Sequence, residues 1–422
     1  MAHKKTLNPS SRYLIHLLAC GLHGRPAQAL PKGASWEQVH ALARWNSVEG
    51  AAWAGAHSQA DAMPADLART WAAAANLTMW RRLQFDTERE HVLAALDDAG
   101  FSYLPLKGVL IAPLYPDASM RAMADNDILY GYVEPDPDGG FRVRGDTPEE
   151  RDRTVKQGTR DVARVMEGLG YVAEDLGRYH HDGFQKAPIF NFELHRALIP
   201  ASEAAGDSPL LAGPFENPWK LALPDEPGGH AFHFTEEIHY LFIVAHAYKH
   251  FHGGGTGIRN AVDEYVVWNA WHDRIDLGVI APYLDEMGVR DFELRLRDVS
   301  LEAFGERACN VALPALSADA DGMLAYMLGS GTYGTLENHV ANDLESRFGE
   351  DGEPAWRVKL GYLAQRISMP EETRRDLYPV LGTHKALAPL FYLARIGKLV
   401  SKLPKVARET GYITRYRRDG DR

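Results

Sequence analysis

The stretch Asp125-Asn126-Asp127-Ile128-Leu129-Tyr130 decides how the middle of this 422-residue chain is expected to fold. Its apolar end predicts a buried β-strand. Side chains alternate between the faces of a strand, so Asp125 and Asp127 point one way and Ile128 points into the core. Two adjacent carboxylates repel each other unless a cation lies between them. Because Mg²⁺ takes oxygen ligands and is usually held by one or two carboxylates with substrate phosphates, the pair predicts a magnesium site. A solvated strand end is the alternative.

Segments on both sides of this strand predict a small α/β module over residues 99–215. Residues 101–106 resemble a strand, followed by a short helix or turn over 109–115. A helix is expected from the N-cap Thr147 to about residue 168, because Pro and Glu follow that threonine at the first and third helical positions. Two further strands are expected to begin at 171–172 and at 189–195.

Helical periodicity dominates the remainder of the chain. Residues 1–98 predict an N-terminal helical region and residues 216–422 a C-terminal helical region. The predicted fold class is therefore α+β, with a small mixed sheet between two helical regions. The clearest helical segments are 36–53, 67–96, 236–251, 262–271 and 301–311, and a Pro/Gly/Asp-rich loop is expected over 134–146.

Composition excludes several classes of protein. The formal net charge of −11 argues against a sequence-independent nucleic-acid binder, which needs a basic surface. Two cysteines in all exclude a disulfide framework and a cysteine-rich zinc site, and they favour the cytoplasm. Residues 13–29 imitate a signal peptide, but His16 and Cys20 interrupt the apolar stretch, which favours an amphipathic helix. The chain contains no run of 18 apolar residues, so no transmembrane span is predicted.

Other charged residues accompany the Asp pair. Lys107-Gly108 ends the preceding strand, where glycine lets a backbone N–H approach a phosphate closely. Arg121 lies four residues before the pair, within reach of a triphosphate. A third carboxylate, Glu193, shares one face of a later strand with His195. Two-metal transfer at phosphorus needs such an acid to hold the catalytic ion and to accept the proton of the attacking hydroxyl.

The second helical region adds polar residues at helical spacing. His246, Lys249 and His250 fall within one predicted helix, and the two histidines at i, i+4 could hold zinc, line a cleft, or be ordinary helix residues. Arg259 and Asp263 are also at i, i+4. A structural ion pair is the default interpretation, and contact with a triphosphate or acceptor is the alternative.

Two motifs are interpreted as connections. Residues 329–334 match the dinucleotide-binding glycine pattern but lack a βαβ context, so they predict a loop. His180-His181 predicts a turn close to the cleft, since it directly precedes the strand of Glu193.

The arrangement of these motifs resembles a family of uncharacterised bacterial nucleotidyltransferases. That family belongs to the DNA polymerase β superfamily, whose usual signature is a Gly-Ser turn followed by Asp-x-Asp. Two features differ from the signature: the turn serine is absent, and the distance from the turn to the Asp pair is longer than usual. The segments that carry the resemblance are 106–115, 121–128 and 192–195, with 36–39 and 246–250 outside the core.

The resemblance implies a polymerase-β-like core and assigns roles to residues. Asp125 and Asp127 would be metal ligands, with Glu193 as the third catalytic acid. Gly108 would lie at the phosphate turn. The implied cofactor is Mg²⁺, with two ions bound, and Mn²⁺ can substitute.

The expected reaction is transfer of a nucleoside monophosphate group from an NTP to a hydroxyl or phosphate, with release of pyrophosphate. The acidic charge favours a small molecule, peptide or protein as acceptor over nucleic acid. Two alternatives stay open: a phosphotransferase that moves the γ-phosphate, and a non-catalytic module that senses nucleotide or binds a partner.

The C-terminal tail reverses the sign of the chain. Residues 395–422 carry nine Lys or Arg and three Asp or Glu, and residues 390–403 predict an amphipathic helix. Such a segment could dock on the protein's own acidic surface, on a partner, or weakly on anionic lipid.

Overall fold

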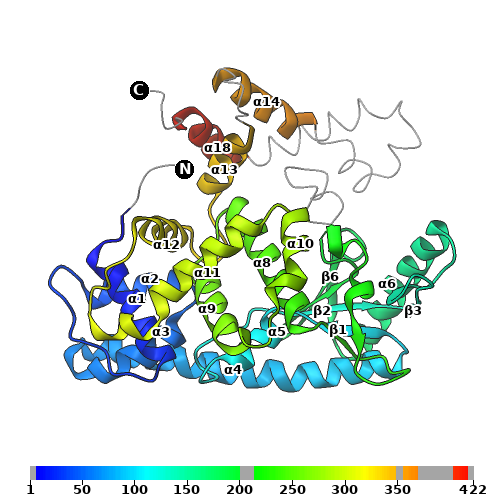
Figure 1. Cartoon of the computed structure of the whole chain (residues 1–422), viewed down its shortest axis with the longest axis horizontal. Helices are drawn as coiled ribbons and strands as arrows, with labels where there is room; N and C mark the ends of the chain where they lie inside the picture. Colours follow the sequence, from blue (N-terminus) through cyan, green and yellow to red (C-terminus); the bar gives the residue numbers. More distant parts are fainter. Residues whose placement is uncertain (1–5, 200–212, 348–354, 369–402, 417–422) are drawn as a thin grey trace.

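The computed structural model describes residues 6–199, 213–347, 355–368 and 403–416 (Figure 1). Its mixture of helices with one mixed five-stranded sheet agrees with the expected α+β class. No helix among the described residues has both the length and the apolar character that crossing a membrane requires. The predicted amphipathic helix over 390–403 lies outside these residues, apart from its last position.

The sheet has the strand order β1-β2-β7-β6-β5. Strands β2 and β7 are parallel, whereas the other neighbouring pairs are antiparallel. The expected strands are confirmed, with bounds β1 Ser102–Pro105, β2 Asn126–Gly131, β5 Val172–Glu174 and β7 Phe190–His195.

Two parts of the sheet region differ from the sequence-based expectation. His180-His181 is not a simple turn, because β6 (His181–Lys186) begins at the second histidine. This strand is mostly polar and has a single large apolar side chain, so its periodicity is weak, and pairing with β5 and β7 defines it. The expected loop over 134–146 contains the hairpin of β3 (Val133–Pro135) and β4 (Phe141–Val143).

The sheet has one apolar face and one polar face. Helix α6 (Pro148–Gly168) covers the apolar face, and its expected N-terminus is confirmed, because Thr147 and Glu150 form a capping box. Buried side chains of three strands and two helices form one core: Ile128, Tyr130, Phe184, Phe192 and Leu194 of β2, β6 and β7, Val162 and Met166 of α6, and Val92 and Leu96 of α4. The opposite face keeps Asp127, Glu193 and His195.

Helices before and after the sheet share a single large core. The N-terminal helices are α1 (Pro9–Leu22), α2 (Trp36–Trp45), α3 (Glu49–Ala56) and the 34-residue α4 (Ala65–Asp98). After β1 come the one-turn α5 (Gly108–Ile111) and the short β8 (Leu223–Pro224) and β9 (Phe232–His233). The second helical region begins with α8 (Glu236–His252), α9 (Arg259–Trp271), α10 (Leu277–Glu286), α11 (Arg290–Phe304) and α12 (Ala318–Ser330).

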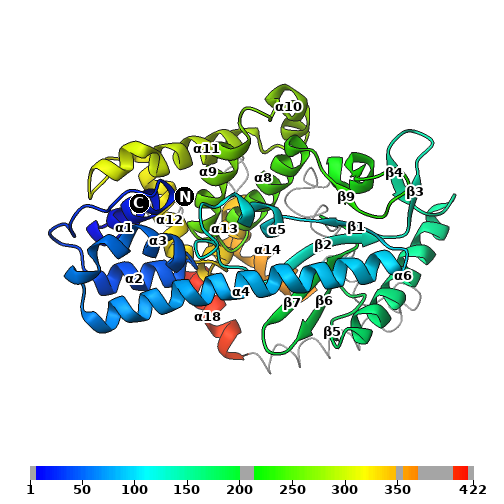
Figure 2. The ribbon, with the colours of Figure 1, turned by 90° about the horizontal axis from the view of Figure 1, so that it is seen from below.

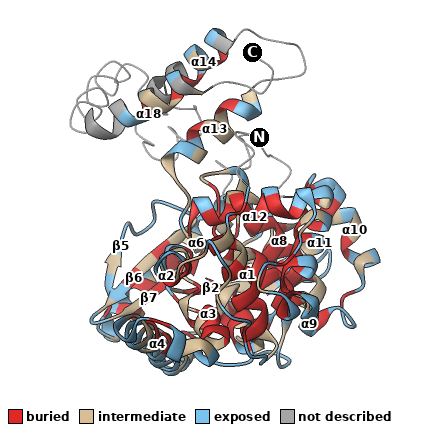
Figure 3. Ribbon diagram, turned by 90° about the vertical axis from the view of Figure 1, so that its left-hand side faces the viewer, coloured by how far each residue is buried: buried red, intermediate tan, exposed pale blue. Residues whose placement is uncertain are grey.

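Burial is concentrated where the N-terminal helices pack against α8, α9, α11 and α12 (Figure 3). Helix α1 is buried on nearly all sides rather than on one, so the expectation of an amphipathic helix is wrong in that respect. His16 fits into this core because its Nδ1 donates to Ala308 O at 2.8 Å and its Nε2 accepts from the Gln28 N–H at 2.9 Å.

The helix expected over 301–311 is also wrong. Helix α11 ends at Phe304, before Gly305, and a 3₁₀ turn follows over Glu306–Asn310. The glycine-rich residues 329–334 form the expected loop after α12.

The long helix α4 runs beneath both the helical core and the sheet (Figure 2). Helices α13 (Leu336–Arg347), α14 (Ala355–Ser368) and α18 (Leu403–Arg415) lie on the other side of the molecule and share a small core of their own. Helix α8 lies close to the expected site, because Lys107 Nζ is 6.0 Å from the ring centroid of its Phe242.

Candidate functional site

The paired register of β2 and β7 builds the centre of the site. Asp127 pairs with Glu193 across the parallel strands, and paired residues point to the same face. Asp125 lies one residue before β2 begins and is half-buried. The three carboxylates expected to act together are therefore at the same edge of the polar face.

Asp127 is buried and already has two partners. Lys107 Nζ donates to its Oδ1 at 3.0 Å, and His195 Nε2 lies 2.7 Å from the same oxygen. A carboxylate only accepts hydrogen bonds, so His195 is the tautomer with its proton on Nε2. Its Nδ1 is buried without a hydrogen-bond partner among the described residues. His195 thus orients the carboxylate, whose Oδ2 receives no hydrogen bond from them.

A tight turn brings Lys107 to this position. The Leu106 N–H donates to Asp127 O at 2.9 Å, and Lys107 follows with φ 45°, a conformation that non-glycine residues rarely adopt. Backbone strain of this kind is typical of functional sites. Gly108 comes next, in close contact with Arg121. A Cβ added to Gly108 would lie 2.8 Å from Nη1 of Arg121.

The carboxylates have different electrostatic environments. Burial, and then the charges of Asp127 and Glu193, raise the pKa of Asp125 to about 6, although Lys107 and Arg259 oppose this. Burial, followed by the charge of Asp127, also raises the pKa of Glu193. Burial would raise the pKa of Asp127 too, but the charge of Lys107 and the bond from His195 hold it well below its usual value. Electrostatic repulsion is therefore concentrated on Asp125 and Glu193.

These residues fit a divalent metal. One ligand atom each from Asp127, Glu193 and His195 lies within 4.8 Å of the others. Asp125 lies outside that set, but the charges of Asp127 and Glu193 raise its pKa. A cation between the acids would relieve their repulsion, and the two carboxylates offer the hard oxygen ligands that Mg²⁺ takes.

Arg121 does not extend into the cleft as the sequence suggested. It forms a buried, forked ion pair with Asp263, with distances of 2.8 Å from Nε to Oδ1 and 3.0 Å from Nη2 to Oδ2. Tyr115 OH donates to the same carboxylate at 2.7 Å. Both charges are neutralised behind the Lys107-Gly108 turn, so the pair supports the turn from inside.

The expected ion pair between Arg259 and Asp263 is wrong, because Asp263 pairs with Arg121 instead. Arg259 begins α9 and is half-buried, and its Nε is buried without a hydrogen-bond partner among the described residues. Its charge lowers the pKa of Asp125. Arg259 is thus a cation close to the carboxylates.

Helix α8 brings His246, Lys249 and His250 to the same region. The two histidine Nε2 atoms lie 3.0 Å apart. Burial, then Lys249, lowers the pKa of His250 to about 4, and burial followed by Lys107 lowers that of His246 well below its usual value. Among the described residues, neither histidine belongs to a group that could hold a metal, so the zinc interpretation gains no support. The structure instead favours the interpretation as a polar patch beside the carboxylates.

His180 and His181 are the site residues that the sequence placed in a turn. Their rings lie 5.6 and 5.3 Å from the ring of His195, and His181 Nε2 lies 3.9 Å from Glu193 Oε2. Burial, and then His195, lower the pKa of His180 to about 2. The two adjacent histidines are the sequence feature that could have indicated site residues, but their position in the site depends on the pairing of β6 with β7.

Comparison with known proteins identifies the family of the chain. A family model described as uncharacterised nucleotidyltransferase matches residues 32–132 and 152–305, more than half of the chain. The matched ranges contain Lys107, Asp127, Glu193 and Arg259, and they omit the β3–β4 hairpin. No curated protein and no solved structure matches the chain. The chain therefore belongs to this family of nucleotidyltransferases, and it is an enzyme of that class.

Proposed function

We propose that the protein catalyses Mg²⁺-dependent transfer of a nucleoside monophosphate group from an NTP to an acceptor, on a core of the polymerase-β type. The observation that carries the proposal is the register of Asp127 with Glu193 on parallel strands, with Asp125 immediately before β2. The strand order places this acidic cluster on a polar face whose back is covered by α6. Family membership supports the same chemistry.

Asp125, Asp127 and Glu193 would hold the metal. When bound, Mg²⁺ supplies positive charge that stabilises the phosphoryl oxygens and the departing pyrophosphate. Lys107 and Arg259 are protein cations beside these acids, and both lower the pKa of Asp125. They are suited to bind the triphosphate once Mg²⁺ neutralises the carboxylates, because a local group of cations attracts a polyanion even in a chain of net charge −11.

In the reaction, an acceptor oxygen attacks the α-phosphorus of the NTP. A new bond forms between that oxygen and the α-phosphorus, and the bond to the bridging oxygen of the β-phosphate breaks. Pyrophosphate leaves with the bonding electron pair. Glu193, whose pKa is raised by burial and by Asp127, is positioned to accept the hydroxyl proton. His195 and Lys107 hold Asp127 in place by their bonds to Oδ1.

Mass analysis of the released nucleotide products tests this proposal. The full chain is incubated with Mg²⁺, each NTP in turn, and cell extract, and we expect pyrophosphate together with an acceptor that gains one NMP. Asp127→Ala is the control that removes metal binding. Release of a nucleoside diphosphate would instead indicate γ-phosphoryl transfer. NTP binding without any product would contradict the proposed reaction.

A further inference from the structure

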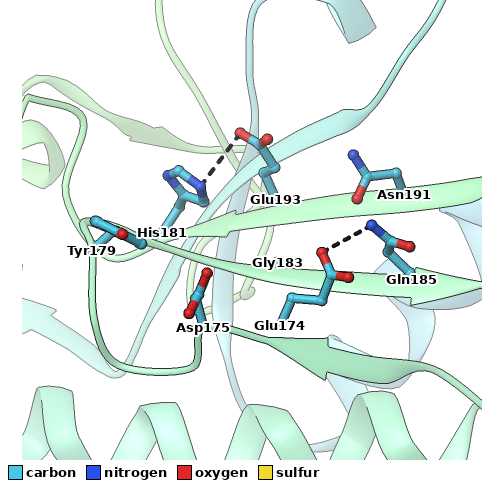
Figure 4. A pocket seen from close by; sticks show the side chains of 8 residues that line it. All are labelled: Glu174, Asp175, Tyr179, His181, Gly183, Gln185, Asn191 and Glu193. Atoms are coloured by element: carbon cyan, nitrogen blue, oxygen red, sulfur yellow. Dashed lines mark hydrogen bonds and ion pairs between the residues drawn. The ribbon is translucent and has the colours of Figure 1, made fainter. Parts of the chain in front are cut away.

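A cavity of about 160 Å³ adjoins Glu193 on the polar face of the sheet. Side chains from β5, β6 and β7 line it, together with residues of the loop between β5 and β6 (Figure 4). A cavity of this order is large enough to hold one six-membered ring. It lies on the β5–β6 side of Glu193, whereas Lys107 and Asp127 lie on the β2 side.

The register of the strands explains the hollow. Asp127 pairs with Glu193, Glu193 with Gly183, and Gly183 with Glu174, so the four form one row across four strands. Residues paired in this way point to the same face. Since Gly183 has no side chain, the row is interrupted between the carboxylates of Glu193 and Glu174.

The lining of this cavity is rich in hydrogen-bond acceptors. Glu174, Asp175 and Glu193 contribute carboxylates, and Asn191 and Gln185 contribute amides. None of the described residues that line it is Lys or Arg. Two of these acids already accept a hydrogen bond. Gln185, which also lines the cavity, donates to Glu174 Oε2 at 2.9 Å, and Arg178, outside the lining, donates to Asp175 Oδ1 at 2.7 Å.

The charge distribution separates two binding regions around Glu193. Lys107 and Arg259 lie beside Asp125 and Asp127, where a triphosphate is attracted. The cavity on the other side carries carboxylates, which repel a phosphate and favour donors such as hydroxyl and ammonium groups. Tyr179, whose ring stacks on His181 at 6.4 Å, adds an aromatic wall that suits the apolar face of a sugar ring or a cation.

We propose that this cavity is the acceptor site, and that the acceptor is a hydroxylated compound carrying a protonated amine rather than a phosphorylated one. The proposal rests on the proposed nucleotidyl transfer and names its substrate class. The hydroxyl is the nucleophile, because a protonated amine has no free electron pair. Its oxygen bonds to the α-phosphorus beside Glu193, pyrophosphate leaves, and the hydroxyl proton passes to Glu193.

Two variants of the cavity allow a sharp test. In Gly183→Ala the new Cβ would meet only Glu174, at 3.6 Å from its carbonyl oxygen and 3.7 Å from its Cβ, which are ordinary contacts. The fold should therefore tolerate the methyl group, which narrows the hollow. Glu174→Gln keeps the shape and removes one charge. Gly322→Ala, on an exposed part of α12 with open space around the added Cβ, is the matched control.

The probes are glucosamine, glucose and glucose 6-phosphate, which share one ring and differ in charge. Their binding to the full chain with Mg²⁺ and ATP is measured by ligand-observed NMR, and ATP affinity is measured separately. We expect glucosamine to bind about tenfold more tightly than glucose, and glucose 6-phosphate to bind most weakly. Gly183→Ala and Glu174→Gln should each weaken glucosamine binding about tenfold, with ATP affinity unchanged, and Gly322→Ala should behave as wild type.

Absence of a preference for the amine, a preference for the phosphate, or cavity variants that bind as wild type would each overturn the proposal. Pyrophosphate release is followed in parallel. If glucosamine binds in a manner that depends on Gly183 but no acceptor yields pyrophosphate, the proposed reaction fails while the cavity assignment stands.

Discussion

Single residues of the acidic cluster differ in what they contribute to stability. Asp127 is stabilised by Lys107 and His195, whereas Asp125 is repelled by two neighbouring carboxylates. Attractive contacts thus stabilise the aspartate at 127, whereas the aspartate at 125 is destabilised by repulsion. A mutation that removes either carboxylate should abolish turnover, but the two mutations should shift stability in opposite directions.

Without divalent metal, Asp125→Ala should raise the free energy of unfolding by on the order of 1 kcal/mol, since it removes a repelled charge from a partly exposed site. Asp127→Ala should lower it by roughly 3 kcal/mol, since it leaves the half-buried Lys107 and the buried His195 without their partner. Denaturant unfolding of both variants measures the difference. Equal shifts would show that Asp127 is not held by these contacts.

Glu193 is expected to contribute to the chemical step more than to folding contacts, because His181 and His195, both 3.9 Å away, contact its carboxylate only loosely. Glu193→Gln should therefore leave NTP affinity within a factor of a few and reduce the rate of transfer by about 10²–10⁴-fold. Single-turnover kinetics separates the two effects. A parallel loss of affinity and rate would assign Glu193 a binding role.

At the scale of elements, the turn between β1 and α5 transmits packing from inside the protein to the site. Gly108→Ala would place a Cβ 2.8 Å from Arg121 Nη1, and the forked pair with Asp263 restrains that guanidinium. We expect a loss of about 1–3 kcal/mol in stability and weaker NTP binding, because Lys107 must shift.

Gly158→Ala in helix α6 is the control for this prediction, because its added Cβ would make ordinary contacts, at 3.7 Å to Phe101 and 3.9 Å to Tyr132. Thermal unfolding and NTP titration of both variants provide the measurements. Unchanged NTP affinity in Gly108→Ala would show that Arg121 moves without disturbing the turn.

Helices α8, α9 and α11 are joined by a buried polar contact. Tyr240 OH lies 2.7 Å from Glu264 Oε1 and 2.8 Å from Glu293 Oε1, but it has only one proton to donate. Arg297 pairs with Glu293 at 2.8 Å, so Glu293 is the ionised acceptor. Glu264 must then be protonated and donate to Tyr240, which agrees with its pKa, raised by burial to about 8.

This contact makes stability depend on pH. The pKa of Glu264 is higher in the folded chain than in the unfolded chain, so its contribution is fully present below the unfolded value of about 4.5 and is lost as pH rises through about 8. Glu264→Gln, which keeps a donor to Tyr240, should remove that part of the decline. Denaturant unfolding at pH 5 and pH 9 gives the free energy of unfolding of this variant and of wild type. The same decline between the two pH values in both proteins would contradict the protonated state of Glu264.

At the scale of the whole molecule, the site depends on segments far apart in the chain. The large core joins α1 to helices more than 200 residues later, and α4 passes beneath that core and the sheet. The helices α13, α14 and α18 are built differently, with a small core of Val340, Leu344, Val358, Tyr362 and Ile413. Tyr362 OH also donates to Glu409 at 2.6 Å.

Removal of the chain after Lys385 should therefore spare the site and expose apolar surface. The truncated protein lacks α18, so we expect unchanged NTP affinity and self-association through α13 and α14. Size-exclusion chromatography measures the association, and full-length Ile413→Asp should reproduce it. A truncated chain that stays monomeric but no longer sediments with anionic vesicles would favour lipid docking of the basic tail.

The local sequence by itself determined the acidic cluster and most strands around it. The Asp-x-Asp pattern, the capping box of α6 and the alternation around Glu193 depend on neighbours within a few residues, so they can be predicted from the local sequence. Tertiary structure alone decided three other features: the pairing of Arg121 with Asp263, the identity of β6 as a strand, and the cavity at Gly183. The physical reason is that ion pairing, strand register and cavities depend on contacts between segments far apart in the chain, which local periodicity does not encode.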